Sequence, residues 1–203
     1  VVMKNIPSDI FAVTAVIISS EKWIVNHLGQ EIALDKNRFS YLFKGKEHTF
    51  DAVFIAVHGA PGENGELQRL LERIKIPYTG CSAEVAALTY NKYKTLEKLQ
   101  PYGIATAKRV FIDKNASWSS DTLIDAVGLP CFVKANKAGS SFGVVKVNKA
   151  TDMAPAIETA LKEDDEVLVE GFLSGTEVSI GVIEYKGNVI VLPPTEIITN
   201  SDF

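Results

Sequence analysis

The chain has 203 residues, 46% of them hydrophobic, and a formal net charge of −4 at pH 7. This length can bury a sizeable core in one or two domains, and because the scattered lysines and arginines form no basic patch, neither nucleic acid nor an anionic membrane is expected as a partner. The longest apolar run, near residues 11–18, is far below the roughly 18 residues of a transmembrane helix.

Residues 1–90 read as alternating strands and helices. The first six residues are typical of the last turn of a helix. Apolar runs at residues 11–19 and 50–57 are short enough for strands buried on both faces, and helices are expected between and after them. An apolar stripe predicts a helix over residues 66–74.

A short strand at residues 76–79 follows that helix, and Ser82 is the predicted N-cap of the next one. This alternation of strands and helices predicts an open parallel sheet. The pattern changes near residue 90, where we place a domain boundary.

Residues 91–175 predict a small mixed α/β unit. A helix containing Tyr93 stops at Pro101 and Gly103. Further strands are expected at residues 108–112, 131–135, 144–147 and 166–170, with helices at 121–127 and from about 151 onward. Beyond residue 175, a hairpin around Lys186-Gly187-Asn188 opens a further region.

The segment from Phe132 to Val147 places Lys134 and a Gly/Ser loop between two apolar runs. Glycine lets the backbone approach an anion, serine hydroxyls and loop N–H groups donate to its oxygens, and Lys134 adds a positive charge. Because a strand follows the loop, it is not a Walker-type loop, and we expect a flap over a nucleotide triphosphate. The alternative is a surface hairpin whose glycines and serines only make the turn.

A second candidate site begins at His58 and Gly59, directly after the run at residues 50–57. Ligands of open α/β sheets bind at the carboxyl ends of strands. The spacing of the glycines here is not that of a dinucleotide fold, so a nicotinamide enzyme is not expected. We assign His58 a ligand role, and the alternative is a strand-end residue that caps nearby backbone.

A third candidate site runs from Glu170 to Glu177, across a turn that follows a strand. Backbone groups of Gly171, Phe172 and Leu173 could pair with an adenine edge while Glu177 accepts from ribose hydroxyls. The alternative is two solvated acids that flank a turn.

Taken together, these motifs resemble the D-alanine–D-alanine ligase family of ATP-grasp enzymes. The matching segments are HGAPGENGELQ, IPYTG, NKYKT, FVKANKAGSSFGVVKV and VLVEGFLSGTEV, and the likeness covers essentially all 203 residues. It implies an α/β ATP-grasp architecture with three parts: an N-terminal substrate-binding domain at 1–90 without its first strand, a central subdomain at 91–175 with the flap, and the start of the C-terminal subdomain at 176–203.

The resemblance implies an ATP-dependent ligase that joins two D-alanine molecules through an acyl phosphate, for peptidoglycan precursor synthesis. His58, Gly59 and Ser140 would contact D-alanine, and His58 and Ser140 would have the catalytic roles. The residues implied to bind ATP are Lys92, Lys134, Ser140, Ser141, Gly143, Glu170, Gly171, Phe172, Leu173 and Glu177.

Two positions depart from the family pattern: Ala135 stands where a proline commonly follows the flap lysine, and Asn91 where an aspartate commonly precedes the helix lysine. The family's opening strand, glycine-rich turn and substrate-binding glutamate would precede Val1. Its closing loop, an arginine and the Asp, Glu and Asn ligands of Mg²⁺ or Mn²⁺ would follow Phe203. We therefore assign no metal ligand within the chain and expect these 203 residues alone to be inactive.

Two other functions stay open: a ligase that joins D-alanine to D-lactate or D-serine, and a non-catalytic ATP-grasp nucleotide-binding module. The family implies a homodimer. Cys81 and Cys131 lie among apolar or turn residues and are expected to be free, buried thiols, which favours a reducing, cytoplasmic location. No C-x-x-C pair or His/Cys cluster indicates structural zinc.

Overall fold

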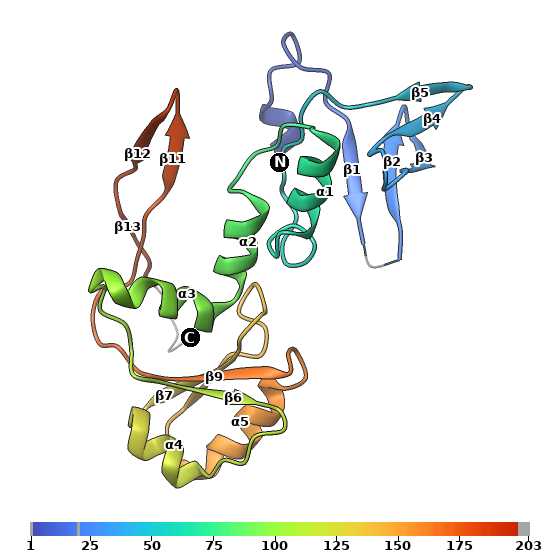
Figure 1. Ribbon diagram of the computed structural model, residues 1–203. Helices are drawn as coiled ribbons and strands as arrows, with labels where there is room; N and C mark the ends of the chain where they lie inside the picture. The colour runs from blue at the N-terminus through green and yellow to red at the C-terminus, as the bar shows by residue number, and fades with distance from the viewer. Residues whose placement is uncertain (1, 20, 199–203) are drawn as a thin grey trace. The chain divides into compact units, whose positions relative to one another are not determined.

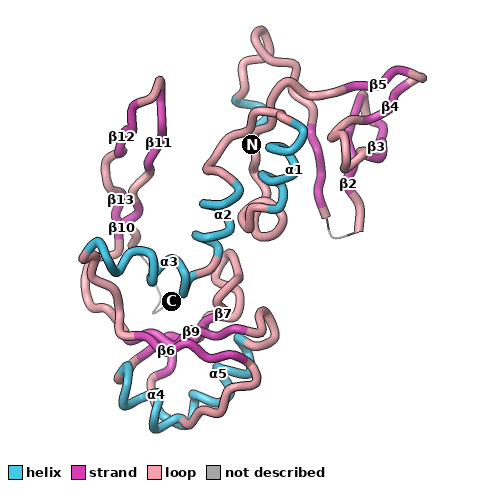
Figure 2. The backbone as a smooth tube through the Cα atoms, viewed as in Figure 1, coloured by secondary structure: helices cyan, strands magenta, loops and turns pink. Residues whose placement is uncertain are grey.

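The computed structural model describes residues 2–19 and 21–198, and its chain divides into two compact units, Val1–Thr95 and Leu96–Phe203 (Figures 1 and 2). Helix α3 (Lys92–Leu99) crosses this division. The domain boundaries expected near residues 90 and 175 stay predictions. None of the helices in the described residues has the length and apolarity needed to cross a membrane.

The first unit contains short strands followed by helices. Its strands pair antiparallel, as a three-stranded sheet β1-β2-β3 and a separate pair β4-β5. In chain order the elements are η1 (Val2–Asn5), β1 (Ala15–Ile18), β2 (Trp23–His27), β3 (Gln30–Ala33), β4 (Tyr41–Phe43), β5 (Lys46–His48), α1 (Glu66–Ile74) and α2 (Ala83–Tyr90).

The helix expected between the first two apolar runs is wrong, because the described residues there form β2 to β5. Two tight turns make the hairpins: Leu28-Gly29 has φ values of 50° and 78°, and Lys44-Gly45 has 49° and 77°. Two-residue turns with positive φ at both positions match the twist of antiparallel strands, and glycine favours this backbone. The X-Gly pairs are the sequence signal for these hairpins.

Among the described residues, the expected parallel sheet is reduced to one bridge between two segments on either side of α1. Val53 pairs parallel with Tyr78, the Val53 N–H donates to the Pro77 carbonyl at 2.8 Å, and the Thr79 N–H donates to the Val53 carbonyl at 3.0 Å. The run at residues 50–57 is therefore not a strand buried on both faces. It pairs on one side only, and Phe54 is 58% exposed.

Helix α1 has the predicted bounds, and its apolar stripe packs on the strands. Leu67 and Leu71 are buried in the core of this unit with Val25, Phe39 and other side chains. Ser82 is the N-cap of α2, as predicted, because its hydroxyl accepts the Val85 N–H at 3.4 Å.

The second unit is built on a four-stranded antiparallel sheet in the order β6-β9-β7-β8. Helices α4 and α5 cover the same face of this sheet (Figure 1). In chain order the elements are η2 (Gln100–Tyr102), β6 (Arg109–Asp113), α4 (Ser120–Val127), β7 (Cys131–Ala135), β8 (Val145–Val147), η3 (Ala150–Asp152), α5 (Met153–Ala160) and β9 (Glu166–Gly171). All strands and helices expected between residues 108 and 170 are present.

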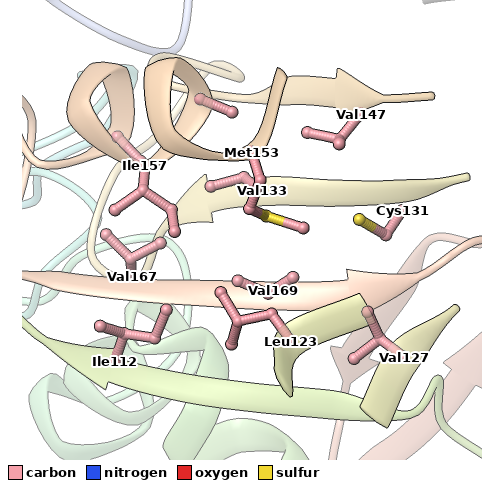
Figure 3. Packing of buried hydrophobic residues seen from close by; sticks show 12 residues of the cluster. Ile112, Leu123, Val127, Cys131, Val133, Val147, Met153, Ile157, Val167 and Val169 are labelled. Atoms are coloured by element: carbon pink, nitrogen blue, oxygen red, sulfur yellow. The ribbon is translucent and has the colours of Figure 1, made fainter. Parts of the chain in front are cut away.

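The core of this unit lies between the sheet and the two helices. Figure 3 shows Val133 and Val169 pointing from neighbouring strands toward Met153 and Ile157 of α5 and Leu123 of α4. Along β7, residues alternate between buried and half-buried. Since side chains alternate across a strand, this pattern places Phe132 and Lys134 on the face opposite the helices.

The two cysteines differ from each other in burial. Both are free, and Cys131 is fully buried, so that burial raises the pKa of its thiol. The expectation of burial is wrong for Cys81, which is exposed. It lies in the turn before α2, between Gly80 and the capping Ser82.

The expected hairpin near residue 186 is confirmed. It consists of β11 (Val182–Tyr185) and β12 (Asn188–Val191), joined by Lys186 and Gly187 with φ values of 52° and 75°. The strands before and after this hairpin in the chain, β10 (Val178–Ser179) and β13 (Thr195–Glu196), pair with each other.

Candidate active site

The loop that begins at His58 in the first unit is closed by Glu63. The Glu63 N–H donates to the Gly59 carbonyl at 2.8 Å, and one Glu63 carboxylate oxygen accepts the Gly59 N–H at 2.9 Å. The other oxygen lies 3.7 Å from His58 Nδ1. The His58 side chain is 87% exposed, so this pairing orients the imidazole loosely while leaving it accessible to a ligand.

Glycine is needed at different positions of this loop for different physical reasons. A Cβ on Gly62 would lie 2.5 Å from the Val57 carbonyl oxygen, and one on Gly65 would lie 2.3 Å from the Ala83 carbonyl oxygen. Gly59, with φ of 67°, faces open space. Gly62 and Gly65 are therefore packing residues, whereas a ligand could approach the backbone at Gly59.

Gln68 of α1 holds the loop that begins at His58 by a hydrogen bond to its backbone. Its Nε2 donates to the Gly62 carbonyl at 2.6 Å, and the residue is buried. Its Oε1 is buried with no hydrogen-bond partner among the described residues. The buried amide thus holds the glycine loop on the helix.

Lys92 is the first residue of α3 and is half-buried in the first unit. The preceding Asn91 acts as a helix cap, because its Oδ1 accepts the Lys94 N–H at 2.9 Å. An asparagine provides this cap as well as an aspartate does. The departure from the family pattern at residue 91 therefore leaves the helix start intact.

In the second unit, Lys134 of β7 forms an ion pair with Glu170 of β9. The register places Phe132 opposite Glu170 and Lys134 opposite Leu168, so the two charges meet diagonally across neighbouring strands. Their side chains are 24% and 13% exposed. The Glu170 carboxylate thus holds the Lys134 ammonium in place on this surface of the sheet.

Phe172 extends this surface beyond the end of β9. The centroid of its ring lies 6.2 Å from the centroid of the Phe132 ring and 5.6 Å from Lys146 Nζ. A flat apolar surface beside a lysine can stack with a planar base.

The amides of Gly171 and Phe172 are already used, since they donate to the carbonyls of Lys108 at 2.9 Å and Pro130 at 3.2 Å. Leu173 N–H makes no backbone hydrogen bond within the described part of the chain. Of the amides expected to read an adenine edge, Leu173 is thus the available donor. Glu177 is exposed beyond the turn.

The flap loop follows β7 as expected. Ser140 and Ser141 are exposed and have φ values of 50° and 59°. Such left-handed backbone is uncommon outside glycine and is often found at functional sites. Two turn hydrogen bonds shape the loop, from Phe142 N–H to the Gly139 carbonyl at 3.1 Å and from Val144 N–H to the Ser141 carbonyl at 3.3 Å.

Sequence reasoning missed the polar contacts at the base of this flap. Asn136 and Lys137 contact Asp164 and Glu166, which come just before and at the start of β9. The sequence signal for these contacts would have been the Asn-Lys pair directly after one strand and the acidic run that leads into another. It becomes visible only once β7 is known to pair with β9.

The described residues show no metal centre. Among the described residues, no three His, Cys, Asp or Glu side chains gather in a way that could hold a metal ion. No ligand of the Mg²⁺ that the family implies is therefore assigned among these described residues, and no chemical step is assigned to the ion.

The chain matches two family models. The one described as D-ala D-ala ligase N-terminus covers residues 1–81, and the one described as D-ala D-ala ligase C-terminus covers residues 99–203. The chain belongs to the D-alanine–D-alanine ligase family. The resemblance based on its motifs is confirmed.

Curated relatives of the family agree. The chain is 48% identical to a D-alanine–D-alanine ligase of Flavobacterium johnsoniae over 92% of its own length and 45% identical to one of Christiangramia forsetii over its full length. It spans 58% and 63% of these two relatives, about three fifths of their length.

Solved structures of D-alanine ligases confirm the α/β ATP-grasp fold class. D-alanyl-alanine synthetase A of Vibrio cholerae is 32% identical, with a TM-score of 0.83 and coverage of 94% of this chain and 58% of that one. The VanG D-Ala:D-Ser ligase of Enterococcus faecalis is 29% identical, with a TM-score of 0.84 and coverage of 100% of this chain and 64% of that one.

Proposed function

We propose that the protein containing this chain is an ATP-dependent ligase that joins two D-alanine molecules for peptidoglycan precursor synthesis. The observation that carries the proposal is the half-buried Lys134–Glu170 pair beside the Gly/Ser flap, on a sheet surface that continues to Phe172. Family membership and relatives named D-alanine–D-alanine ligase support it.

In the proposed reaction, the carboxylate of one D-alanine takes the γ-phosphoryl group of ATP, which releases ADP. The amine of a second D-alanine then attacks the acyl phosphate, losing a proton and displacing phosphate as the peptide bond forms. Phosphoryl transfer depends on positioning and on neutralising charge. Lys92 and Lys134 would provide positive charge at the phosphates, and Ser140, Ser141 and Gly143 would cover them. When bound, Mg²⁺ would supply further charge neutralisation in this chemistry.

For the nucleotide, we assign the adenine to Phe172 and the segment Glu170–Leu173, with the Leu173 N–H as the donor to a ring nitrogen. Glu177 would accept from the ribose hydroxyls. For D-alanine, we assign His58 and Gly59, together with Ser140. His58 and Ser140 are the residues proposed to contact reacting groups.

The test is product analysis with the full-length protein, ATP and Mg²⁺. Formation of D-alanyl-D-alanine with equal amounts of ADP is the expected result, and the Lys134→Ala variant should form little. Failure of the wild-type protein to form any dipeptide, while it still binds ATP, would support a non-catalytic nucleotide-binding module instead.

A ligase with a different acceptor is the second candidate. The likeness to a structure titled D-Ala:D-Ser ligase, with a TM-score of 0.84, is the observation that supports it. Parallel reactions with D-serine and D-lactate beside D-alanine separate these activities, because each product has a different mass. We expect the dipeptide of two D-alanines to predominate.

We also infer that the protein works as a homodimer in the cytoplasm, where ATP is available. Sedimentation velocity of the full-length protein tests the dimer, and cell fractionation tests the location.

A further inference from the structure

The base of the flap is held by a cluster that joins the end of β7 to the start of β9. The two strands run antiparallel, with Ala135 opposite Val167. Asn136, the next residue along the chain, therefore lies beside Glu166, although the two are 30 positions apart. We call Asn136, Lys137, Asp164 and Glu166 the flap anchor.

Asn136 is the most buried member of the flap anchor. It is 0% exposed, and its backbone N–H donates to the Glu166 carbonyl at 2.8 Å. Its Nδ2 donates to Glu166 Oε2 at 2.6 Å. A buried amide bonded to a carboxylate contributes more than a neutral hydrogen bond, and losing it leaves the carboxylate without that donor.

Lys137 adds a second set of contacts. Its backbone N–H donates to Asp164 Oδ2 at 2.8 Å, and its Nζ lies 3.0 Å from Glu166 Oε1 and 3.7 Å from Asp164 Oδ1. Burial disfavours the charged ammonium, but the hydrogen bond to Glu166 and the charge of Asp164 outweigh it and raise the pKa of Lys137. The lysine thus stays charged between the two acids.

The other end of the flap is fixed by close packing. Gly143 has φ of 67°, and a Cβ there would lie 2.9 Å from Glu163 Cγ and 3.4 Å from Ala160 Cα. Glu163 belongs to the same connection between α5 and β9 that supplies Asp164. Both ends of the flap therefore rest on one short segment, residues 160–166.

Between these fixed ends, Ser140, Ser141 and Phe142 are exposed. A loop tethered at two points can move at its tip while its ends stay in register. The position of the serines then depends on whether the flap anchor holds.

We propose that the flap anchor consists of positioning residues, which set where Ser140 and Ser141 lie when the loop covers the nucleotide. This proposal rests on the proposed function. A flap that lost its anchor would admit water to the acyl phosphate. Water would replace the second amine as the nucleophile, giving back D-alanine and phosphate, so that ATP is consumed without peptide formation.

The first arm of the test measures amide hydrogen exchange of residues 139–144 in the full-length protein without ligands. The variants are Asn136→Ala and Asp164→Ala, and the matched control is Asp165→Ala. Asp165 lies in the same turn but pairs with Lys114, at 2.6 Å, away from the flap. We expect about tenfold faster exchange in the two anchor variants and wild-type exchange in the control.

The second arm measures phosphate released per dipeptide formed. This ratio should rise several-fold in both anchor variants and stay at one in Asp165→Ala. Glu166→Gln keeps an acceptor for Asn136, so its ratio of phosphate to dipeptide should rise less than that of Glu166→Ala. A role in general stability alone would lower total activity without changing the ratio.

Faster flap exchange together with a raised ratio supports the proposal. Equal exchange in Asn136→Ala and Asp165→Ala, or faster exchange with an unchanged ratio, overturns it. If the wild-type protein forms no dipeptide, the proposed function and the role in coupling both fail. The exchange arm then still decides whether these four residues anchor the loop.

Discussion

The ammonium of Lys134 in β7 is paired with the carboxylate of Glu170 in β9, on the sheet face opposite α4 and α5. Both side chains are mostly buried. Water therefore screens this charge pair less than it screens the surface pairs of the same unit. The pair keeps Lys134 extended across the strands at the position where the proposed nucleotide phosphates would lie.

Replacing Lys134 with Met keeps the apolar stem and removes the charge. Because a unit charge pair at about 4 Å is worth up to about 4 kcal/mol at an effective dielectric constant near 20, we expect kcat/KM for ATP to fall at least about 100-fold. Steady-state kinetics of the full-length protein provide the measurement. Lys114→Met, which removes the exposed partner of Asp165, is the matched control and should behave as wild type. Similar kinetics for the two variants would contradict the role of Lys134.

Gly65 and Gly80 separate two reasons for a glycine in the first unit. Both have positive φ, 86° and 107°, but a Cβ on Gly65 would lie 2.3 Å from the Ala83 carbonyl oxygen whereas one on Gly80 meets nothing within 4 Å. Gly80→Ala should cost about 1–2 kcal/mol for the left-handed backbone alone. Gly65→Ala should cost about 3 kcal/mol or more, because overpacking adds to that strain.

Urea unfolding monitored by Trp23 fluorescence, in a Trp118→Phe background, reports on this unit. Equal losses of stability in Gly65→Ala and Gly80→Ala would show that the close approach of Gly65 to α2 carries no energetic weight.

The structure of the second unit agrees closely with the prediction from its sequence, whereas that of the first unit does not, and the difference has physical reasons. In β7, the short apolar run predicted the strand, and its residues alternate between buried and half-buried because helices cover one face only. In the first unit, the run at residues 50–57 looks like a doubly buried strand but bonds to one neighbour through Val53. The sequence pattern of a segment shows which of its faces are apolar, but it does not show which other segments pack against those faces.

The candidate site shows the same limit. Lys134, the serines and Phe172 could be proposed from sequence because each lies in a recognisable segment. The contact of Asn136 with Glu166 depends on a pairing of strands 30 positions apart, and neither residue is unusual in its own segment. The ligand role of His58 stays a prediction, and only the structure shows that Glu63 folds back on it.

Ile157 of α5 belongs to the core shown in Figure 3 and is fully buried. Ile157→Ala should destabilise the second unit by about 2–5 kcal/mol, because it removes apolar contacts and leaves a cavity against the sheet. Met153→Leu, one turn earlier and equally buried, conserves volume and should cost less than about 1.5 kcal/mol. Urea unfolding followed by Trp118 fluorescence in a Trp23→Phe background measures both. A similar loss in the two variants would mean that the cavity collapses.

Glu72 and Tyr78 link α1 to α2 and should make the stability of the first unit depend on pH at both extremes. The Glu72 carboxylate accepts the Ala83 N–H at 2.9 Å and the Tyr78 hydroxyl at 2.6 Å, which lowers the pKa of Glu72 below its ordinary 4.5. Burial and the hydrogen bond to Glu72 raise the pKa of Tyr78 from 10.0 to about 12.

The sign of each effect follows from which protonation state the fold favours. The fold favours ionised Glu72, so its contribution is complete above pH 4.5 and is lost as pH falls through the lowered pKa. It favours neutral Tyr78, so that contribution is complete below pH 10.0 and is lost as pH rises through about 12. Glu72→Gln should lower the urea midpoint at pH 7, and its difference from wild type should shrink toward pH 3, whereas Tyr78→Phe should flatten the alkaline limb. Glu21→Gln, an exposed carboxylate of the same unit, is the control. A Glu72→Gln difference that is as large at pH 3 as at pH 7 would show that the carboxylate charge has no part in this link.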